Sequence, residues 1–420
     1  MASHSQSHEK SDQPRTITIT IPSTRKIYQI VALTALFITT LVLVIKGGAH
    51  IGRKESALAR KQNMNYDSDA KYDSDAIKYK EQYSYVKYKV PEYTGKKARA
   101  TFVTLARNND KNGLLSTVKS VEDRFNSKYQ YDWVFLNDVE FNDDFKKTMT
   151  ALISGTVKFG VIPKEHWSFP SWIDQDRAAE TRKKMKEEKI IYGDSIPYRH
   201  MCRFESGFFW RHPLLDEYEY YWRVEPDTKL HCDIDYDIFR FMKDNKKKYG
   251  FTISIKEFMK TIPTLWDTTL NFTSLHPEFV NKNNMLDFIS NDNGKTYNSC
   301  HFWSNFEIAS LDFWRSEAYT KYFEYLDNAG GFFYERWGDA PVHSIAASLF
   351  LDRNEIHHFA DLGYFHGPFH QCPIDDVFRL GNRCACKPKD DFTWKGYSCN
   401  TKYYDVNKLK KPENWEDYKK

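Results

Sequence analysis

The sequence predicts an α/β domain built on a parallel sheet, because strand-like and helix-like segments alternate along the chain. Residues 100–105 form an apolar, β-branched run that ends in a polar turn. Residues 114–125 then repeat apolar side chains at helical spacing. Further strand-like runs follow at residues 131–136 and 157–162. Such alternation is typical of parallel strands joined by crossover helices.

Size and charge narrow the classes of function. The 420 residues could form one large domain or two to three ordinary ones. The 61 basic and 57 acidic residues leave a net charge of only +4, which does not favour a nucleic-acid partner. Aromatic residues make up 16% of the chain and offer rings for a core and for stacking on sugars or bases.

Residues 27–45 are predicted to form a transmembrane helix. They carry no charge, are bounded by Arg25-Lys26 and Lys46, and are just long enough to cross a bilayer. A cleaved signal peptide has a shorter apolar region and a small-residue cleavage site, and Gly47-Gly48-Ala49 leaves that alternative open. We favour an uncleaved anchor preceded by a cytosolic tail at residues 1–26.

Two kinds of sequence feature give opposite indications of the side of the membrane on which the C-terminal part lies. The Lys and Arg residues around the anchor do not favour a cytosolic N-terminus under the positive-inside rule. A glycosylation sequon at Asn271-Phe272-Thr273 and the position of all seven cysteines beyond residue 200 favour a lumenal C-terminal part. We therefore expect residues 98–420 to be lumenal.

Residues 46–97 are predicted to be a stem between the anchor and the folded domain. This segment is rich in Lys and Tyr and has little from which to build a core. Its short repeat, Tyr-Asp-Ser-Asp-Ala, resembles a calcium loop but lacks the glycine and the terminal glutamate of an EF-hand.

An acidic turn follows a short buried strand at residues 221–224. Pro226 ends the strand, because proline cannot donate to a sheet ladder. Glu225 and Asp227 are thereby placed at the carboxyl end of a strand, where open α/β sheets bind ligands. Carboxylates at this position can hold a hard divalent cation such as Mg²⁺ or Mn²⁺. For so short a pattern taken alone, a strand followed by an ordinary solvated turn is the favoured interpretation.

Other segments carry candidate side chains. Arg107, in the turn after the first strand, could bind an anion with nearby backbone N–H groups, or could simply be a surface arginine. Glu307 is embedded in an aromatic run, and a helix is predicted to start at Pro341. We also expect helices within residues 178–189, 234–247 and 257–260 and a strand at residues 251–255.

The cysteines favour disulfide bonds over a zinc site. Cys372, Cys384, Cys386 and Cys399 lie near the end of the chain, but their spacing is not that of a usual zinc finger. Two disulfides that fix the C-terminal segment fit a lumenal protein better. The odd total leaves at least one thiol unpaired, and the pairing itself stays open.

Four motifs follow one another along the chain: Tyr198-Arg199-His200-Met201-Cys202-Arg203, Arg223-Val224-Glu225-Pro226-Asp227, His301-Phe302-Trp303-Ser304-Asn305-Phe306-Glu307 and Arg336-Trp337-Gly338-Asp339-Ala340-Pro341-Val342-His343-Ser344. In this order they resemble the motifs of the fungal α-1,2-mannosyltransferases, glycosyltransferase family 15. The similarity runs from about Arg99 to the terminal cysteines.

The resemblance implies a GT-A-like nucleotide-sugar-binding fold with a mixed, mostly parallel sheet, GDP-mannose as donor and Mn²⁺ as cofactor. It also implies a single-pass type II Golgi membrane enzyme that extends O- or N-linked mannose chains on glycoproteins.

The resemblance also implies residue roles. Glu225 corresponds to the family's metal-site carboxylate, and His366 to a histidine that contacts the metal. Glu307 corresponds to a glutamate near the anomeric carbon that is proposed as nucleophile. Tyr198 and Asp339 match further active-site positions, Tyr198 near the diphosphate.

Three arginines could neutralise the charge of the diphosphate, namely Arg107, Arg199 and Arg223. A shell of glutamate, histidine and phosphate oxygen suits Mn²⁺ better than Ca²⁺, because imidazole is a softer ligand. Asp227 could ligate the metal, or hold Glu225 or a water molecule.

Two questions stay open at this level. An α-linked product from an α-linked donor means retention, either through a covalent intermediate on Glu307 or by front-face attack with Glu307 stabilising positive charge. Alternative functions are a related Golgi mannosyltransferase of another linkage, a mannosylphosphate transferase, or a mannose-binding membrane lectin without turnover.

Overall fold

The chain divides into two units, residues 1–77 and residues 78–420. The computed structural model describes residues 96–419, all within the second unit. The predicted tail at 1–26, the anchor at 27–45 and almost all of the stem at 46–97 lie outside the described residues and stay predictions. No helix within residues 96–419 is both long and apolar enough to cross a bilayer.

A seven-stranded sheet forms the centre of the domain, in the order β10-β6-β9-β4-β1-β2-β3. Neighbouring strands are parallel except β9, which runs antiparallel to both β4 and β6. The predicted mixed, mostly parallel sheet flanked by helices is therefore confirmed. The strands are β1 (Ala100–Leu105), β2 (Asp132–Asn137), β3 (Val157–Val161), β4 (Tyr220–Val224), β6 (Tyr249–Phe251), β9 (Phe306–Ser310) and β10 (Ile356–His358).

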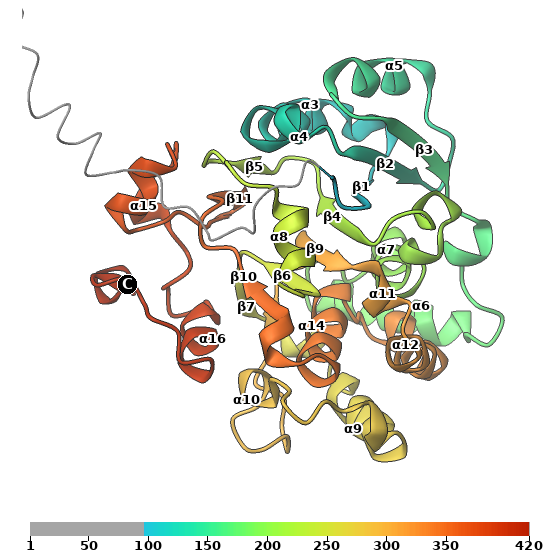
Figure 1. Ribbon diagram of the computed structural model, residues 1–420. Coiled ribbons are helices and arrows are strands. Elements are labelled where there is room, and N and C mark those ends of the chain that lie inside the picture. Colours follow the sequence, from blue (N-terminus) through green and yellow to red (C-terminus); the bar gives the residue numbers. More distant parts are fainter. Residues whose placement is uncertain (1–95, 420) are drawn as a thin grey trace, which may run out of the picture. The chain divides into compact units, whose positions relative to one another are not determined.

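Helices cover both faces of this sheet (Figure 1). Successive strand residues point to opposite faces, so Trp222 joins one apolar core and Tyr221 the other. The core around Trp222 includes side chains of α3 (Lys111–Val121), α5 (Asp143–Leu152) and α8 (Ile238–Asp244). The core around Tyr221 includes side chains of α7 (Ile196–Gly207), α12 (Glu317–Ala329) and α14 (Asp339–Phe350).

Two small sheets complete the domain. One has the order β12-β11-β5, with β5 (Lys229–Leu230), β11 (Tyr364–His366) and β12 (Phe369–His370). The other pairs β7 (Ser254–Lys256) with β8 (Cys300–Phe302). The remaining helices are α4 (Ser127–Tyr129), α6 (Gln175–Glu187), α9 (Leu265–Leu275), α10 (Leu286–Ile289), α11 (Leu311–Trp314), α13 (Gly331–Tyr334), α15 (Asp376–Gly381) and α16 (Asn400–Val406).

Some element boundaries differ from the predicted ones. The strand expected at 251–255 is interrupted, because β6 belongs to the large sheet and β7 to a small one. The helix expected at 257–260 is only a 3₁₀ turn, Met259–Thr261. Pro341 is the third residue of α14 rather than its start, which is tolerated because first-turn N–H groups have no partner within the helix.

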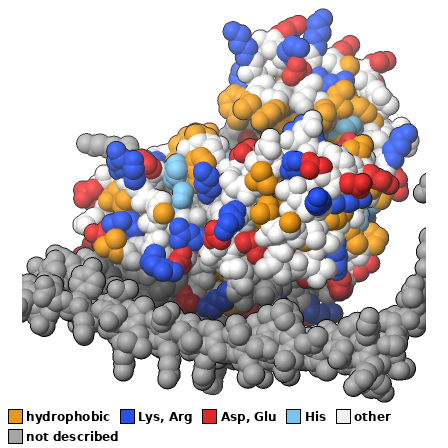
Figure 2. All heavy atoms as spheres, turned by 90° about the horizontal axis from the view of Figure 1, so that it is seen from above, with side chains coloured by type: hydrophobic (Ala, Val, Ile, Leu, Met, Phe, Trp, Pro, Cys, Tyr) orange, Lys and Arg blue, Asp and Glu red, His pale blue; other side chains and the backbone are white. Residues whose placement is uncertain are grey.

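Charges are mixed over the surface that Figure 2 displays. Lys and Arg side chains lie interspersed with Asp and Glu, and hydrophobic side chains gather beneath the projecting lobe. No single-sign field covers this face.

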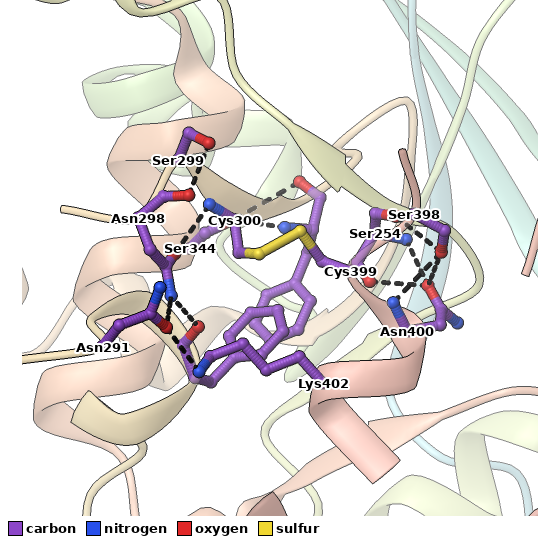
Figure 3. The surroundings of a disulfide bond; sticks show 12 residues. Ser254, Asn291, Asn298, Ser299, Cys300, Ser344, Ser398, Cys399, Asn400 and Lys402 are labelled. Carbon is purple, nitrogen blue, oxygen red and sulfur yellow. Dashed lines mark hydrogen bonds between the residues drawn. A yellow bond between two sulfur atoms is a disulfide. The ribbon is translucent and has the colours of Figure 1, made fainter. Parts of the chain in front are cut away.

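Three disulfides fix the C-terminal segment. Cys232–Cys384 and Cys300–Cys399 tie it to the main body, and Cys372–Cys386 closes a loop within it. The expectation of two bridges was therefore too low, since two of the four late cysteines pair with cysteines of the main body. Cys202 is the unpaired thiol and is buried. Figure 3 shows the Cys300–Cys399 bond, beside which Asn400 Oδ1 accepts a hydrogen bond from Ser254 N at 2.8 Å. The disulfide thus fixes the start of α16 beside β8, and the hydrogen bond fixes it beside β7.

Removing the Cys300–Cys399 bond should cost more stability than removing Cys372–Cys386. The bonds span 99 and 14 residues, and the chain-entropy model assigns about 4.7 kcal/mol to a loop of roughly 100 residues and about 3 kcal/mol to one of roughly 15. We expect Cys300→Ser/Cys399→Ser to lower the free energy of unfolding in urea further than Cys372→Ser/Cys386→Ser. Equal losses, or the reverse order, would contradict this assignment.

Candidate active site

The candidate site lies at the carboxyl end of β4, where the predicted acidic turn begins. Glu225 directly follows Val224, the last residue of the strand. Across the antiparallel β4–β9 pair, Arg223 is opposite Glu307. Directly opposed residues point to the same face of a sheet. The pairing therefore brings a residue 84 positions farther along the chain (307 − 223) to the same place.

Arg223 lies at the centre of the site. Its guanidinium Nη1 donates to Asp339 Oδ2 at 2.6 Å, and Nη2 donates to Glu225 Oε1 at 2.5 Å. Glu205 Oε2 lies 3.8 Å from Nη1. Burial works to lower the pKa of Arg223, but Glu205, Asp339 and Glu225 outweigh it and raise the pKa well above its usual value. Arg223 is therefore a permanent buried cation that holds several carboxylates in place.

Asp339 is the first residue of α14, where the helix dipole favours a negative charge. It also accepts a hydrogen bond from Ser304 Oγ at 2.7 Å. Burial works to raise the pKa of Asp339, but Arg223 and then His343 outweigh it, so the pKa lies below its usual value. Asp339 is ionised at neutral pH.

Glu307 is fully buried and is surrounded by hydrogen-bond donors. Tyr221 donates to Oε1, and Tyr249 donates to Oε2 at 2.8 Å. Burial and then the charge of Glu307 raise the pKa of both tyrosines well above 10, so both keep their protons. His343 Nδ1 also lies 2.9 Å from Oε2.

His343 links Glu307 to α7. Its Nε2 lies 3.1 Å from the carbonyl oxygen of Glu205, while Nδ1 faces Glu307. Burial works to lower the pKa of His343, but Glu307 outweighs it and raises the pKa above 6.5. When the ring carries both protons, both nitrogens donate, which satisfies the two acceptors at once.

Glu225 and His366 form the pair that could hold a metal. His366 Nε2 is 3.7 Å from Glu225 Oε2, and the two side chains are 27% and 28% exposed. The Trp303 ring meets His366 edge-on at 4.9 Å. A carboxylate oxygen and an imidazole nitrogen suit Mn²⁺. Residues 96–419 contain no group of three His, Cys, Asp or Glu side chains able to hold a metal, so substrate or water would have to supply the other ligands.

Asp227 points to a different part of the site. Its backbone is left-handed, with φ 61°, and its carboxylate lies against Gly113 in the first turn of α3. A Cβ on Gly113 would lie only 2.7 Å from Asp227 Oδ1. Within the described residues, Asp227 makes no hydrogen bond to Glu225 or His366. Its charge faces the positive end of the α3 dipole instead.

The other predicted arginines have different environments. Arg107 is exposed and paired with Asp110 at 3.0 Å, and β1 runs parallel to β4, so Arg107 lies at the same edge of the sheet as Glu225. Arg199 is buried and donates to the carbonyl oxygens of Glu335 at 3.2 Å and Ser195 at 3.1 Å. Burial lowers the pKa of Arg199 to about 10. These contacts fix loops around the site, and the predicted diphosphate contacts of both arginines stay predictions.

Tyr198 lies in the first turn of α7, which Ser195 caps by accepting from its backbone N–H at 3.2 Å. The Arg336 guanidinium lies 5.1 Å from the centre of the Tyr198 ring. Burial raises the pKa of Tyr198 well above 10, so it can donate a hydrogen bond at any physiological pH.

Sequence reasoning missed several residues of the site. Tyr221 could have been found, since it lies two residues before Arg223 and so faces the same side of β4. Glu205, Tyr249 and His343 reach the site from separate elements, and no local pattern marks them. Each becomes visible only through its contact with Arg223 or Glu307.

Glu205→Gln should make stability less dependent on pH. Burial raises the pKa of Glu205 to about 7. Between its ordinary value of 4.5 and about 7, the native state therefore binds more protons than the unfolded state, and stability falls as pH rises. We expect the free energy of unfolding of the variant, relative to that of the parent, to increase between pH 5 and pH 8 by at most roughly 3 kcal/mol. Urea unfolding of both proteins at both pH values measures this difference. If the free energy of unfolding of the variant relative to the parent stayed constant or decreased from pH 5 to pH 8, the raised pKa of Glu205 would be contradicted.

Comparison with known proteins identifies the family. The family described as glycolipid 2-alpha-mannosyltransferase matches residues 53–408. The alpha-1,2 mannosyltransferase KTR1 of Saccharomyces cerevisiae is 68% identical over 336 residues, covering 80% of this chain and 86% of KTR1. Glycolipid 2-alpha-mannosyltransferase 1 of Candida albicans is 65% identical over 322 residues, covering 77% and 75%.

Solved structures agree. Core-mannan synthase A (CmsA/Ktr4) of Aspergillus fumigatus, in an Mn/GDP form, has a TM-score of 0.70 and 41% identity, covering 75% of this chain and 86% of that one. Ktr4p of S. cerevisiae in complex with GDP has a TM-score of 0.72 and 35% identity, covering 84% and 95%. With the sheet, the acidic turn and the buried carboxylates above, these matches show that this chain is a glycosyltransferase and belongs to the glycolipid 2-alpha-mannosyltransferase family.

Proposed function

We propose that this protein transfers mannose from GDP-mannose to a mannose-terminated O- or N-linked glycan of a glycoprotein, forming an α-1,2 linkage with retention of configuration. The observation that carries the proposal is the Glu225–His366 pair at the carboxyl edge of the sheet, 3.7 Å apart and partly open to solvent. It is supported by relatives named as α-1,2-mannosyltransferases and by a related structure in an Mn/GDP form.

The donor atoms of this edge fit Mn²⁺. Glu225 Oε2 and His366 Nε2 would hold the ion, which would act as a Lewis acid toward the charge that develops on the diphosphate. Arg223 occupies the other carboxylate oxygen, Oε1, and so fixes the direction of Glu225. Arg107 at the same edge and the Tyr198 hydroxyl would donate to phosphate oxygens.

We propose that Glu307 stabilises positive charge on the sugar rather than attacking it. Its oxygens already accept from Tyr221 and Tyr249 and face His343, and it is fully buried. A carboxylate so bonded is a weak nucleophile but a fixed negative charge. The bond between the anomeric carbon and the phosphate oxygen would break as the acceptor oxygen binds that carbon on the same face. The acceptor proton would pass to the leaving phosphate oxygen.

We also propose a Golgi membrane location, single-pass and type II, with residues 98–420 in the lumen. Disulfides such as the three found here form in oxidising compartments. Asn271 of the sequon is exposed on α9 and so open to glycosylation. Deglycosylation of the cellular protein should shift its electrophoretic mobility, and no shift in a chain carrying an intact sequon would count against lumenal placement.

The function is tested by incubating the protein with GDP-mannose, Mn²⁺ and α-methyl mannoside and determining the product by NMR. We expect an α-1,2-linked dimannoside. A product of another linkage would refute the proposed linkage, and GDP-mannose left unconsumed would refute the activity.

Glu225→Ala should abolish the response of that activity to Mn²⁺, because it removes one of the two protein ligands that we propose for the ion. Arg223 keeps Asp339 as its partner. Asp227→Ala is the matched control, since its carboxylate faces α3. We expect a loss of about 10²-fold or more for the first and a markedly smaller loss for the second, from transfer rates over a range of Mn²⁺ concentrations. The opposite ranking would assign the metal to Asp227.

Glu307→Gln should reduce transfer by about 10²–10³-fold or more, because the neutral amide cannot stabilise positive charge and its NH₂ group would face donors. GDP binding, measured by calorimetry, should be unchanged. A near-normal rate would refute this role for Glu307. A mannosyl adduct on Glu307, detected by mass spectrometry with a slow fluorinated donor, would favour the covalent route instead.

A further inference from the structure

An exposed tyrosine extends the site outward. The ring of Tyr192 is stacked on the ring of Tyr198, with centroids 4.6 Å apart and planes inclined by 11°. Tyr192 is nevertheless 54% exposed, so its other face is open to solvent. Such a ring can stack against a ligand on its outer face while its inner face packs on a residue of the candidate site.

Tyr198 connects this ring to the buried carboxylates. Its ring packs under the Arg336 guanidinium at 5.1 Å. Arg336 in turn stands three residues before Asp339, the first residue of α14. Tyr198 therefore lies between Tyr192 and Arg336, in the segment that leads into α14.

The surroundings of Tyr192 are apolar and exposed. Ile191 is 66% exposed, and on the neighbouring loop Phe258 and Met259 are 47% and 40% exposed. Two contacts bring that loop to this place: Lys260 pairs with Glu188 at 3.5 Å, and the Arg336 N–H donates to the Thr261 carbonyl at 3.0 Å. An exposed aromatic ring with apolar side chains near it suits the C–H face of a sugar.

The backbone at Tyr192 is held in an unusual conformation. Its φ of 56° is left-handed, which costs free energy for a residue with a side chain. The Tyr192 carbonyl accepts hydrogen bonds from Ser195 N at 3.1 Å and Arg199 Nη1 at 3.5 Å. Buried Arg199 thus stabilises the turn that contains Tyr192.

We propose that Tyr192 is a stacking platform for the acceptor glycan, receiving a mannose ring of the acceptor on its outer face. This inference rests on the proposed function, because it names the side of that site on which the acceptor binds. The diphosphate of the donor would bind near Glu225 and His366, and Tyr198, whose hydroxyl would reach a phosphate oxygen, would lie between the donor and Tyr192. Tyr192 is then a specificity-determining residue that acts on acceptor affinity and not on the chemical step.

The test compares Tyr192→Ala and Tyr192→Phe in the full-length protein with Mn²⁺, using α-1,2-mannobiose as acceptor. We expect Tyr192→Ala to raise the acceptor KM about tenfold, the effect of losing one stacked ring. The kcat and the KM for GDP-mannose should be unchanged, and Tyr192→Phe should stay within about twofold of the parent. Tyr397→Ala is the matched control, since Tyr397 is also exposed, at 49%, and lies outside the site.

Direct binding separates this inference from the proposed function. Saturation-transfer NMR of mannobiose needs no turnover, so the parent should show transfer to the sugar protons and Tyr192→Ala should lose it. An unchanged acceptor KM with unchanged NMR signals would overturn the platform. An increased KM for GDP-mannose alone would also overturn it and place Tyr192 on the donor side. A parent that binds mannobiose but transfers no mannose would instead refute the proposed function while supporting the platform.

Discussion

The site depends on one buried cation. Arg223 is enclosed by Glu205, Glu225 and Asp339, and each of these acidic residues comes from a different element of the fold. Breaking a buried ion pair by removing one partner typically costs about 3–5 kcal/mol, because the remaining charge stays uncompensated. The strand β4 and the helices α7 and α14 are therefore tied together at this point, and Glu225 is aimed by the same contact.

A second buried group is built on the same strand pair. Because β9 runs antiparallel to β4, Glu307 comes opposite Arg223, and Tyr221 on β4 donates to Glu307 from the same face. His343 contacts Glu307 through Nδ1 and the backbone of α7 at Glu205 through Nε2. Glu225, which follows β4, is thus partly open to solvent, and Glu307 on the adjacent strand β9 is fully buried. The different roles that we propose for the two carboxylates rest on this difference in access.

The sequence predicted the fold better than the site. Strands β1, β2, β3 and β4 and the position of Glu225 were visible in local patterns, since period-two strands and a strand-ending proline are local properties. His366 was found only through resemblance to a family, and Glu307, which stood out in an aromatic run, received its role only in the same way. Glu205 and His343 were missed, because a buried polar residue is recognised by the residues that it contacts. Glu205 and His343 contact each other although 138 positions separate them in the sequence. The cysteine pairing was likewise inaccessible, since two of the bonds join distant segments.

The central claim is that Glu225, directed by Arg223, and His366 form the protein side of a manganese site. Anomalous diffraction at the manganese edge, from crystals of the protein with Mn²⁺ and GDP, tests it most directly. The account predicts one strong peak within coordination distance of both Glu225 Oε2 and His366 Nε2, with Asp227 still against Gly113. A peak bound to Asp227 and not to Glu225, or one remote from both Glu225 and His366, would contradict it.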